Sequence, residues 1–173
     1  MTIRRISLAA GLVLAAVGCS NDDLITPPVP QYQGGAMFQR YVSMGNSITA
    51  GFQSGGINDS TQQQSYVALV AGKMGSPFYY PSLNPPGCPP PFTNIFTGAR
   101  VLGGTSTTCA LRNPNIPPFL TNVAVPGAEV IDGLENFPAP GTNSNLLTLL
   151  MLGARTQTQA MMDARPTFVS VWL

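Results

Sequence analysis

Short apolar runs alternate with polar, glycine-containing turns over residues 38–173. Residues 38–44, 120–125 and 167–173 are rich in aromatic and β-branched side chains, a composition typical of β-strands. The third run has the apolar, β-branched character of strands that are buried in parallel sheets. We therefore expect three strands in this part of the chain.

Between these strands, apolar residues recur at helical spacing. Residues 62–74 have this pattern, and the Gly-Ser-Pro sequence that follows would end the helix. Residues 128–134 and 156–164 predict two further helical stretches, and residues 145–152 are strongly apolar. Strands that alternate with helices indicate an α/β fold with a parallel sheet.

Residues 77–118 interrupt this alternation. The chain has 18 glycines and 17 prolines, and most of the prolines lie in this segment. An excursion of this length within a domain is usually functional or disordered. A second loop rich in proline is expected at residues 138–141.

Residues 1–18 have the pattern of a secretory signal. Arg4 and Arg5 precede the apolar run 6–17, which is too short to cross a membrane. The run ends in Ala-Val-Gly before Cys19, and these residues resemble the lipobox of bacterial lipoproteins, with alanine where leucine is usual. The resemblance implies cleavage before Cys19 and lipid attachment to its sulfur. An ordinary signal peptide with an incidental cysteine is the alternative.

The residues after Cys19 extend this interpretation. Ser20 implies sorting to the outer membrane, and thus a lipoprotein of the bacterial cell envelope that faces the periplasm or the cell surface. Residues 19–36, rich in proline, glycine and glutamine, predict a flexible tether between the lipid and a single domain at residues 37–173.

The number and distribution of charged residues argue against nucleic-acid binding. Charged residues make up 9% of the chain, and the formal net charge is +1. Loss of residues 1–18 would leave six basic and seven acidic residues. The basic residues include one lysine, Lys73, and form no cluster, which excludes the basic surface that nucleic-acid binding requires.

Cys88 and Cys109 remain once Cys19 carries lipid. In an oxidising periplasm, two such cysteines most simply form a disulfide, which closes a loop rich in proline, glycine and threonine. Two unpaired thiols are the alternative. We expect no metal site, because two cysteines without histidine give too few soft ligands.

Candidate catalytic residues lie at the ends of the first two predicted strands. Ser47 follows the first strand in the sequence Gly45-Asn46-Ser47, where glycine permits backbone geometries closed to other residues. A serine there would present its hydroxyl at the carboxyl edge of the sheet, where ligands usually bind. Gly127 follows the second strand, and its N–H could join that of Ser47 in binding an oxyanion. A plain turn is the alternative reading at both positions.

Together these segments resemble the SGNH, or GDSL-type, serine hydrolases. Residues 45–51, GNSITAG, resemble the block that holds the nucleophile, and residues 122–127 resemble the block that holds the oxyanion glycine. Residues 165–173 resemble the strand that leads into the third block. The resemblance implies a three-layer α/β/α sandwich with a parallel, flavodoxin-like sheet that is incomplete after residue 173.

The same resemblance implies an esterase or lipase that uses no cofactor. Ser47 would attack a carboxylic ester, the Ser47 and Gly127 N–H groups would bind the oxyanion, and Gly45 and Asn46 would support the serine. The substrate would be a small-molecule or lipid ester or an acetylated glycan. Asn46 replaces the usual aspartate of the family, and its amide can still hydrogen-bond the local backbone.

The general base that such a hydrolase uses to activate its serine is absent from the 173 residues. The 173 residues contain no histidine and no late Asp-x-x-His pair. A serine hydroxyl is a weak nucleophile without a base, so we expect the 173-residue chain to be an inactive fragment. Glu129, Asp132 and Asp163 are expected to be surface charges and helix-end residues. The alternative function is a non-enzymatic surface lipoprotein that binds through residues 77–118.

Overall fold

The computed structural model describes residues 35–115, 117–134, 145–153 and 155–173. The chain divides into the units Met1–Gln31 and Tyr32–Leu173, and the described residues belong to the second unit. The predicted signal sequence, Cys19 and the loop at residues 138–141 lie outside the described residues.

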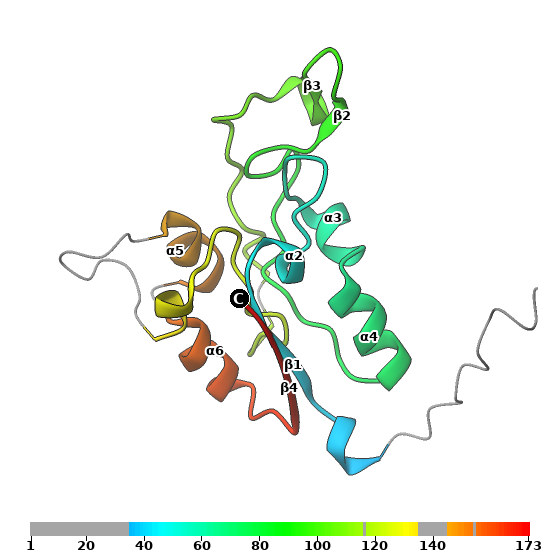
Figure 1. The fold of residues 1–173 in the computed structure, drawn as a ribbon, viewed down its shortest axis with the longest axis vertical. Coiled ribbons are helices and arrows are strands. Elements are labelled where there is room, and N and C mark those ends of the chain that lie inside the picture. Colours follow the sequence, from blue (N-terminus) through cyan, green and yellow to red (C-terminus); the bar gives the residue numbers. More distant parts are fainter. Residues whose placement is uncertain (1–34, 116, 135–144, 154) are drawn as a thin grey trace, which may run out of the picture. The chain divides into compact units, whose positions relative to one another are not determined.

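The centre of the fold is the strand β1, Tyr41–Gly45, which pairs in parallel with β4, Phe168–Trp172 (Figure 1). Residues 121–125 lie along the other edge of β1, also in parallel. There the Ser43 N–H donates to the Thr121 carbonyl at 2.8 Å, and the Val125 N–H donates to the Gly45 carbonyl at 3.0 Å. The described residues thus form a mixed α/β fold with a small parallel sheet.

Two of the three predicted strands need correction. The first begins at Tyr41 rather than residue 38, because Ala36–Phe38 forms a 3-10 turn that the Phe38 N–H closes on the Gly35 carbonyl at 3.0 Å. Residues 120–125 form an isolated bridge at Asn122 rather than a full strand. The third strand is confirmed, since β4 lies within residues 167–173.

Helices pack on both faces of β1. Tyr41 packs with Val67 and Ala71 of α4, Tyr66–Met74, on one face. Val42 packs on the other face with residues of α5, Leu146–Leu152, and α6, Gln157–Asp163. Neighbouring residues of a strand point to opposite faces, so Tyr41 and Val42 divide the core into these two clusters. In Figure 1, α4 lies on one side of β1, and α5 and α6 lie on the other.

The helix predicted at residues 62–74 is two helices. The first, α3, is Asp59–Gln63, and Asn58 caps it through a reciprocal pair of hydrogen bonds with Thr61. The break occurs at Ser65, whose backbone is extended and whose hydroxyl caps α4 by accepting from the Ala68 N–H. Serine favours such a cap because its side chain replaces a missing backbone partner. The helix predicted at residues 128–134 is a 3-10 helix, η4, at Val130–Gly133.

The described residues of the excursion, 77–115 and 117–118, include regular elements. They contain the hairpin of β2, Phe92–Asn94, and β3, Ala99–Arg100, followed by the 3-10 turn η3, Val101–Gly103. Cys88 and Cys109 are joined by a disulfide. The buried Gln62 side chain also holds the excursion, because it donates to the Pro81 carbonyl and accepts from the Leu83 N–H.

Candidate active site

Ser47 is the first residue of α2, Ser47–Ala50, a single helical turn that follows β1 directly. Asn46 caps this turn, since its Oδ1 accepts from the Ile48 N–H at 3.3 Å. Gly51 ends it with a φ of 88°, which favours glycine. Ser47 is half-buried at this strand-to-helix turn, so its hydroxyl remains accessible.

Gly45 is required by close packing rather than by an unusual φ, which corrects the sequence-based reason. Its φ lies outside the left-handed region. A Cβ at this position would instead overlap the carbonyl oxygen of Trp172 and lie 2.6 Å from Thr49 Oγ1. The glycine therefore lets β1, β4 and α2 approach one another at the serine.

Gln157 is a site residue that the sequence analysis missed. Its side chain is 0% exposed, and it reaches from α6 to the backbone of Gly45. The Gly45 N–H donates to Gln157 Oε1, and Gln157 Nε2 donates to the Gly45 carbonyl, each at 3.1 Å. No sequence signal marks this residue, because glutamine is mostly exposed in folded proteins.

The structure brings Gly127 beside Ser47. Gly127 has a φ of 77°, and its N–H donates to Ser47 Oγ at 3.3 Å. Asn122 helps to hold the two segments together, because its Nδ2 donates to the Thr49 carbonyl at 3.0 Å and its Oδ1 accepts from the Ala124 N–H. The predicted nucleophile and the predicted oxyanion donor therefore meet, although 80 positions separate them in the chain.

The carboxylates around these segments have structural partners. Asp132 accepts from the Glu129 N–H at 2.7 Å and caps η4. Asp132 is buried, which corrects the expectation of a surface charge, because the cap turns its side chain inward. Asp163 is exposed and forms an ion pair with Arg155 at 2.6 Å. Since the chain has no histidine, Ser47 lacks an imidazole base among these residues.

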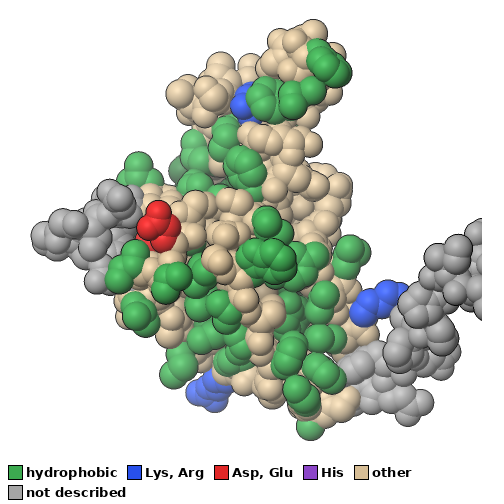
Figure 2. All heavy atoms as spheres, in the orientation of Figure 1, with side chains coloured by type: hydrophobic (Ala, Val, Ile, Leu, Met, Phe, Trp, Pro, Cys, Tyr) green, Lys and Arg blue, Asp and Glu red, His purple; other side chains and the backbone are tan. Residues whose placement is uncertain are grey.

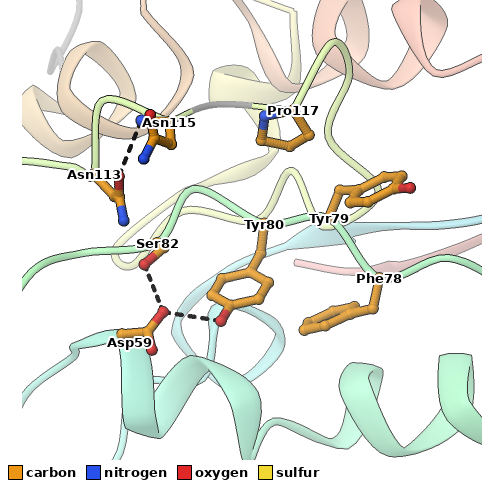
Figure 3. Close-up of a pocket in the computed structure, with 8 residues that line it drawn as sticks. All are labelled: Asp59, Phe78, Tyr79, Tyr80, Ser82, Asn113, Asn115 and Pro117. Atoms are coloured by element: carbon orange, nitrogen blue, oxygen red, sulfur yellow. Dashed lines mark hydrogen bonds between the residues drawn. The ribbon is translucent and has the colours of Figure 1, made fainter.

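A separate cavity lies between the start of α3, residues 78–82, and the side chains of Asn113, Asn115 and Pro117 (Figure 3). Its volume is about 560 Å³, and neither Ser47 nor Gly127 lines it. Asp59 Oδ1 accepts from the hydroxyls of Tyr80 and Ser82 at its floor. Burial, and then the hydrogen bond to Asp59, raises the pKa of Tyr80 to about 12, so its hydroxyl stays protonated and donates. No motif in the sequence marks these residues as a site.

The face of the molecule drawn in Figure 2 carries little charge. On the face drawn in Figure 2, hydrophobic and neutral polar side chains predominate, and Lys, Arg, Asp and Glu are few. Within the described ranges, no cluster of His, Cys, Asp and Glu could hold a metal ion. No helix among the described residues is long and apolar enough to span a membrane.

Comparison of the chain with protein-family models, curated proteins and solved structures finds no match.

Proposed function

We propose that this protein is a serine ester hydrolase of the SGNH type. The observation that carries the proposal is the hydrogen bond from the Gly127 N–H to Ser47 Oγ at 3.3 Å. When Ser47 Oγ attacks an ester carbonyl carbon, the carbonyl oxygen on that carbon would lie within reach of the same donor. Backbone N–H groups aimed at this position stabilise the negative charge that develops during acyl transfer.

In the proposed reaction, Ser47 Oγ attacks the ester carbonyl carbon, and a base accepts the hydroxyl proton. The carbonyl oxygen gains negative charge between the N–H groups of Ser47 and Gly127, each of which contributes about 3 kcal/mol. Collapse of this intermediate expels the alcohol, which takes up the proton, and leaves the acyl group on Ser47. Water then releases the acid by the same route in reverse.

The arrangement around β1 is compatible with the SGNH type. The nucleophile strand has the oxyanion segment, residues 121–125, on one edge and β4 on the other, all in parallel. Helices cover both faces of β1. We propose that this is part of a three-layer α/β/α sandwich with a flavodoxin-like sheet, and that the base comes from residues outside these 173.

The decisive experiment is labelling with a fluorophosphonate probe, combined with hydrolysis of p-nitrophenyl acetate. Two proteins are compared: the 173-residue chain, and the protein encoded by the whole natural reading frame. If that frame supplies a histidine base, we expect the whole protein to label and to hydrolyse the ester. The 173-residue chain should be slower by several orders of magnitude, because base removal in such triads has that effect.

Ser47→Ala should abolish labelling and turnover, and Ser106→Ala, at an exposed loop serine, should leave both unchanged. Labelling that survives Ser47→Ala would refute the nucleophile assignment. A whole protein that contains no histidine base and does not label would favour the non-enzymatic surface lipoprotein.

We also propose that Cys19 carries the lipid anchor in the cell envelope. Multiple acyl chains hold a protein stably at a membrane, whereas one holds it marginally. The protein should incorporate labelled palmitate in bacterial cells, and Cys19→Ser should abolish this incorporation. Unchanged labelling of the Cys19→Ser variant would exclude the lipobox.

A further inference from the structure

In residues 78–82, the Phe78 and Tyr80 rings lie together on one side of the chain, and the Tyr79 ring lies apart from them. Tyr79 is fixed by its backbone, since its N–H donates to Thr121 Oγ1 at 2.7 Å and its carbonyl accepts from the Thr121 N–H at 2.7 Å. The Tyr79 ring packs edge-on against Phe119. Phe78 and Tyr80 stack on each other with their centroids 4.9 Å apart, and both line the cavity of about 560 Å³. Figure 3 shows the two rings side by side, with Tyr79 directed elsewhere.

Polar side chains also line this cavity, and hydrogen bonds fix the orientation of several of them. Asp59 accepts from Tyr80, from Ser82 and, through Oδ2, from Gln63 Nε2 at 2.7 Å. Asn113 Oδ1 accepts from the Asn115 N–H at 2.9 Å, which fixes the plane of the Asn113 carboxamide at the cavity. A stacked aromatic pair thus faces hydroxyl, carboxylate and carboxamide groups whose rotamers are held by hydrogen bonds.

A second cavity of about 320 Å³ extends this site. It shares Asp59, Ser82 and Asn113 with the first cavity, and it adds Asn84 and Ser60. None of the residues that line either cavity is a lysine or arginine, and Asp59 is the one acidic residue among them. This composition disfavours phosphate, carboxylate and nucleic-acid ligands, which require cationic partners.

We propose that these two joined cavities bind a neutral oligosaccharide. A pyranose ring has apolar C–H faces, which pack against aromatic rings, and a rim of hydroxyls, which need donors and acceptors. The volume of the larger cavity lies within the range of about 300–1,000 Å³ that is common for small-molecule sites. The shared residues provide a continuous polar floor along which a second sugar unit reaches the smaller cavity. The proposal does not rest on ester hydrolysis at Ser47.

The test measures binding of purified protein to soluble oligosaccharides by calorimetry and by ¹⁵N chemical-shift mapping. The neutral probes are cellohexaose, xylohexaose, maltohexaose and laminarihexaose, and hexagalacturonate and adenosine serve as charged and aromatic comparisons. We expect at least one neutral probe to bind, with the largest shifts at residues 78–82 and 113. The comparison ligands should bind more weakly than that probe.

Two variants locate the site. Phe78→Ala and Asn113→Ala should each weaken binding by about tenfold, a loss expected for an anchoring contact. Phe78 also packs beside the cluster of Tyr41 and Val67, so the Asn113 variant keeps the test valid if Phe78→Ala fails to fold. Phe96→Ala is the matched aromatic control, because Phe96 is 97% exposed and lies beyond β2.

The proposal is overturned if no neutral probe binds below about 10 mM, a weak limit for a specific site. It is also overturned if binding is unchanged in Asn113→Ala, or if shifts map away from residues 78–82. Tighter binding of hexagalacturonate or adenosine would assign the cavity to another class of ligand. These results are independent of Ser47 labelling, so this inference and the proposed hydrolase activity can fail separately.

Discussion

Gln157→Met should destabilise the fold mainly by leaving one buried backbone group, the N–H of Gly45, without a partner. Gln157 is 0% exposed, and its amide exchanges two hydrogen bonds of 3.1 Å with Gly45. Methionine has a similar volume, so the substitution removes these bonds while opening little space.

The structure sets the expected fall in the free energy of unfolding. The Gly45 carbonyl keeps a second donor in this variant, the Val125 N–H at 3.0 Å. The Gly45 N–H has no such replacement, and a buried donor without a partner costs about 1–3 kcal/mol. With the bond to the carbonyl also lost, we expect the free energy of unfolding to fall by about 2–3 kcal/mol. This corresponds to a fall in Tm of about 6–9 °C for a domain of this size.

The assay is urea unfolding followed by circular dichroism, with Gln64→Met as the control because Gln64 is exposed. The control should change the unfolding free energy by less than about 0.5 kcal/mol. Gln157→Glu adds a second measurement. Its carboxylate cannot donate to the Gly45 carbonyl, and burial raises the pKa of such a group. This variant should therefore regain stability relative to wild type as the pH falls and the carboxyl becomes protonated.

A loss below about 0.5 kcal/mol for Gln157→Met would refute the assignment, since it would mean that water or a backbone shift satisfies the Gly45 N–H. So would a loss equal to that of Gln64→Met. A Gln157→Glu variant whose relative stability does not change with pH would show that the amide donor has no role.

Three further predictions follow from other parts of the structure. Non-reducing peptide mapping should recover a peptide cross-linked between Cys88 and Cys109, and recovery of free thiols would contradict this. Replacing both cysteines by serine should lower the free energy of unfolding by about 3 kcal/mol, because the disulfide closes a loop with a sequence separation of 21. Gly45→Ala should lower the free energy of unfolding by about 3 kcal/mol, because its Cβ overlaps a backbone carbonyl. Gly72→Ala should raise it by about 1 kcal/mol, because its Cβ meets nothing within 4 Å outside the helix backbone and its chain neighbours. Equal effects in urea unfolding would refute the packing argument. Tyr80 should ionise near pH 12, and Tyr80→Phe should remove that absorbance transition. Because its folded pKa lies above the ordinary value of 10.0, its stabilising effect is complete below pH 10 and is lost as the pH rises toward 12.

Local sequence patterns determined several elements of the fold. Residues 156–164 and 167–173 predicted α6 and β4, because the helical spacing of apolar residues and β-branched content are patterns within a few residues. The strand-end glycine and serine at residues 45–47 were likewise visible, since a turn after a strand is a local feature. The split of residues 62–74 was also local in origin, but the serine cap was overlooked beside the apolar periodicity.

Only the tertiary structure decided which distant groups meet. The hydrogen bonds between Gln157 and Gly45 join residues 112 positions apart, and the hydrogen bond between Gly127 and Ser47 joins residues 80 positions apart. The cavity lined by Phe78 and Tyr80 depends on hydrogen bonds from Tyr79 to Thr121 and from Tyr80 to Asp59. A single sequence records hydrophobic spacing and turn chemistry within each segment. It does not record which segments pair, and whether a glutamine or a tyrosine is buried depends on the segment that packs over it.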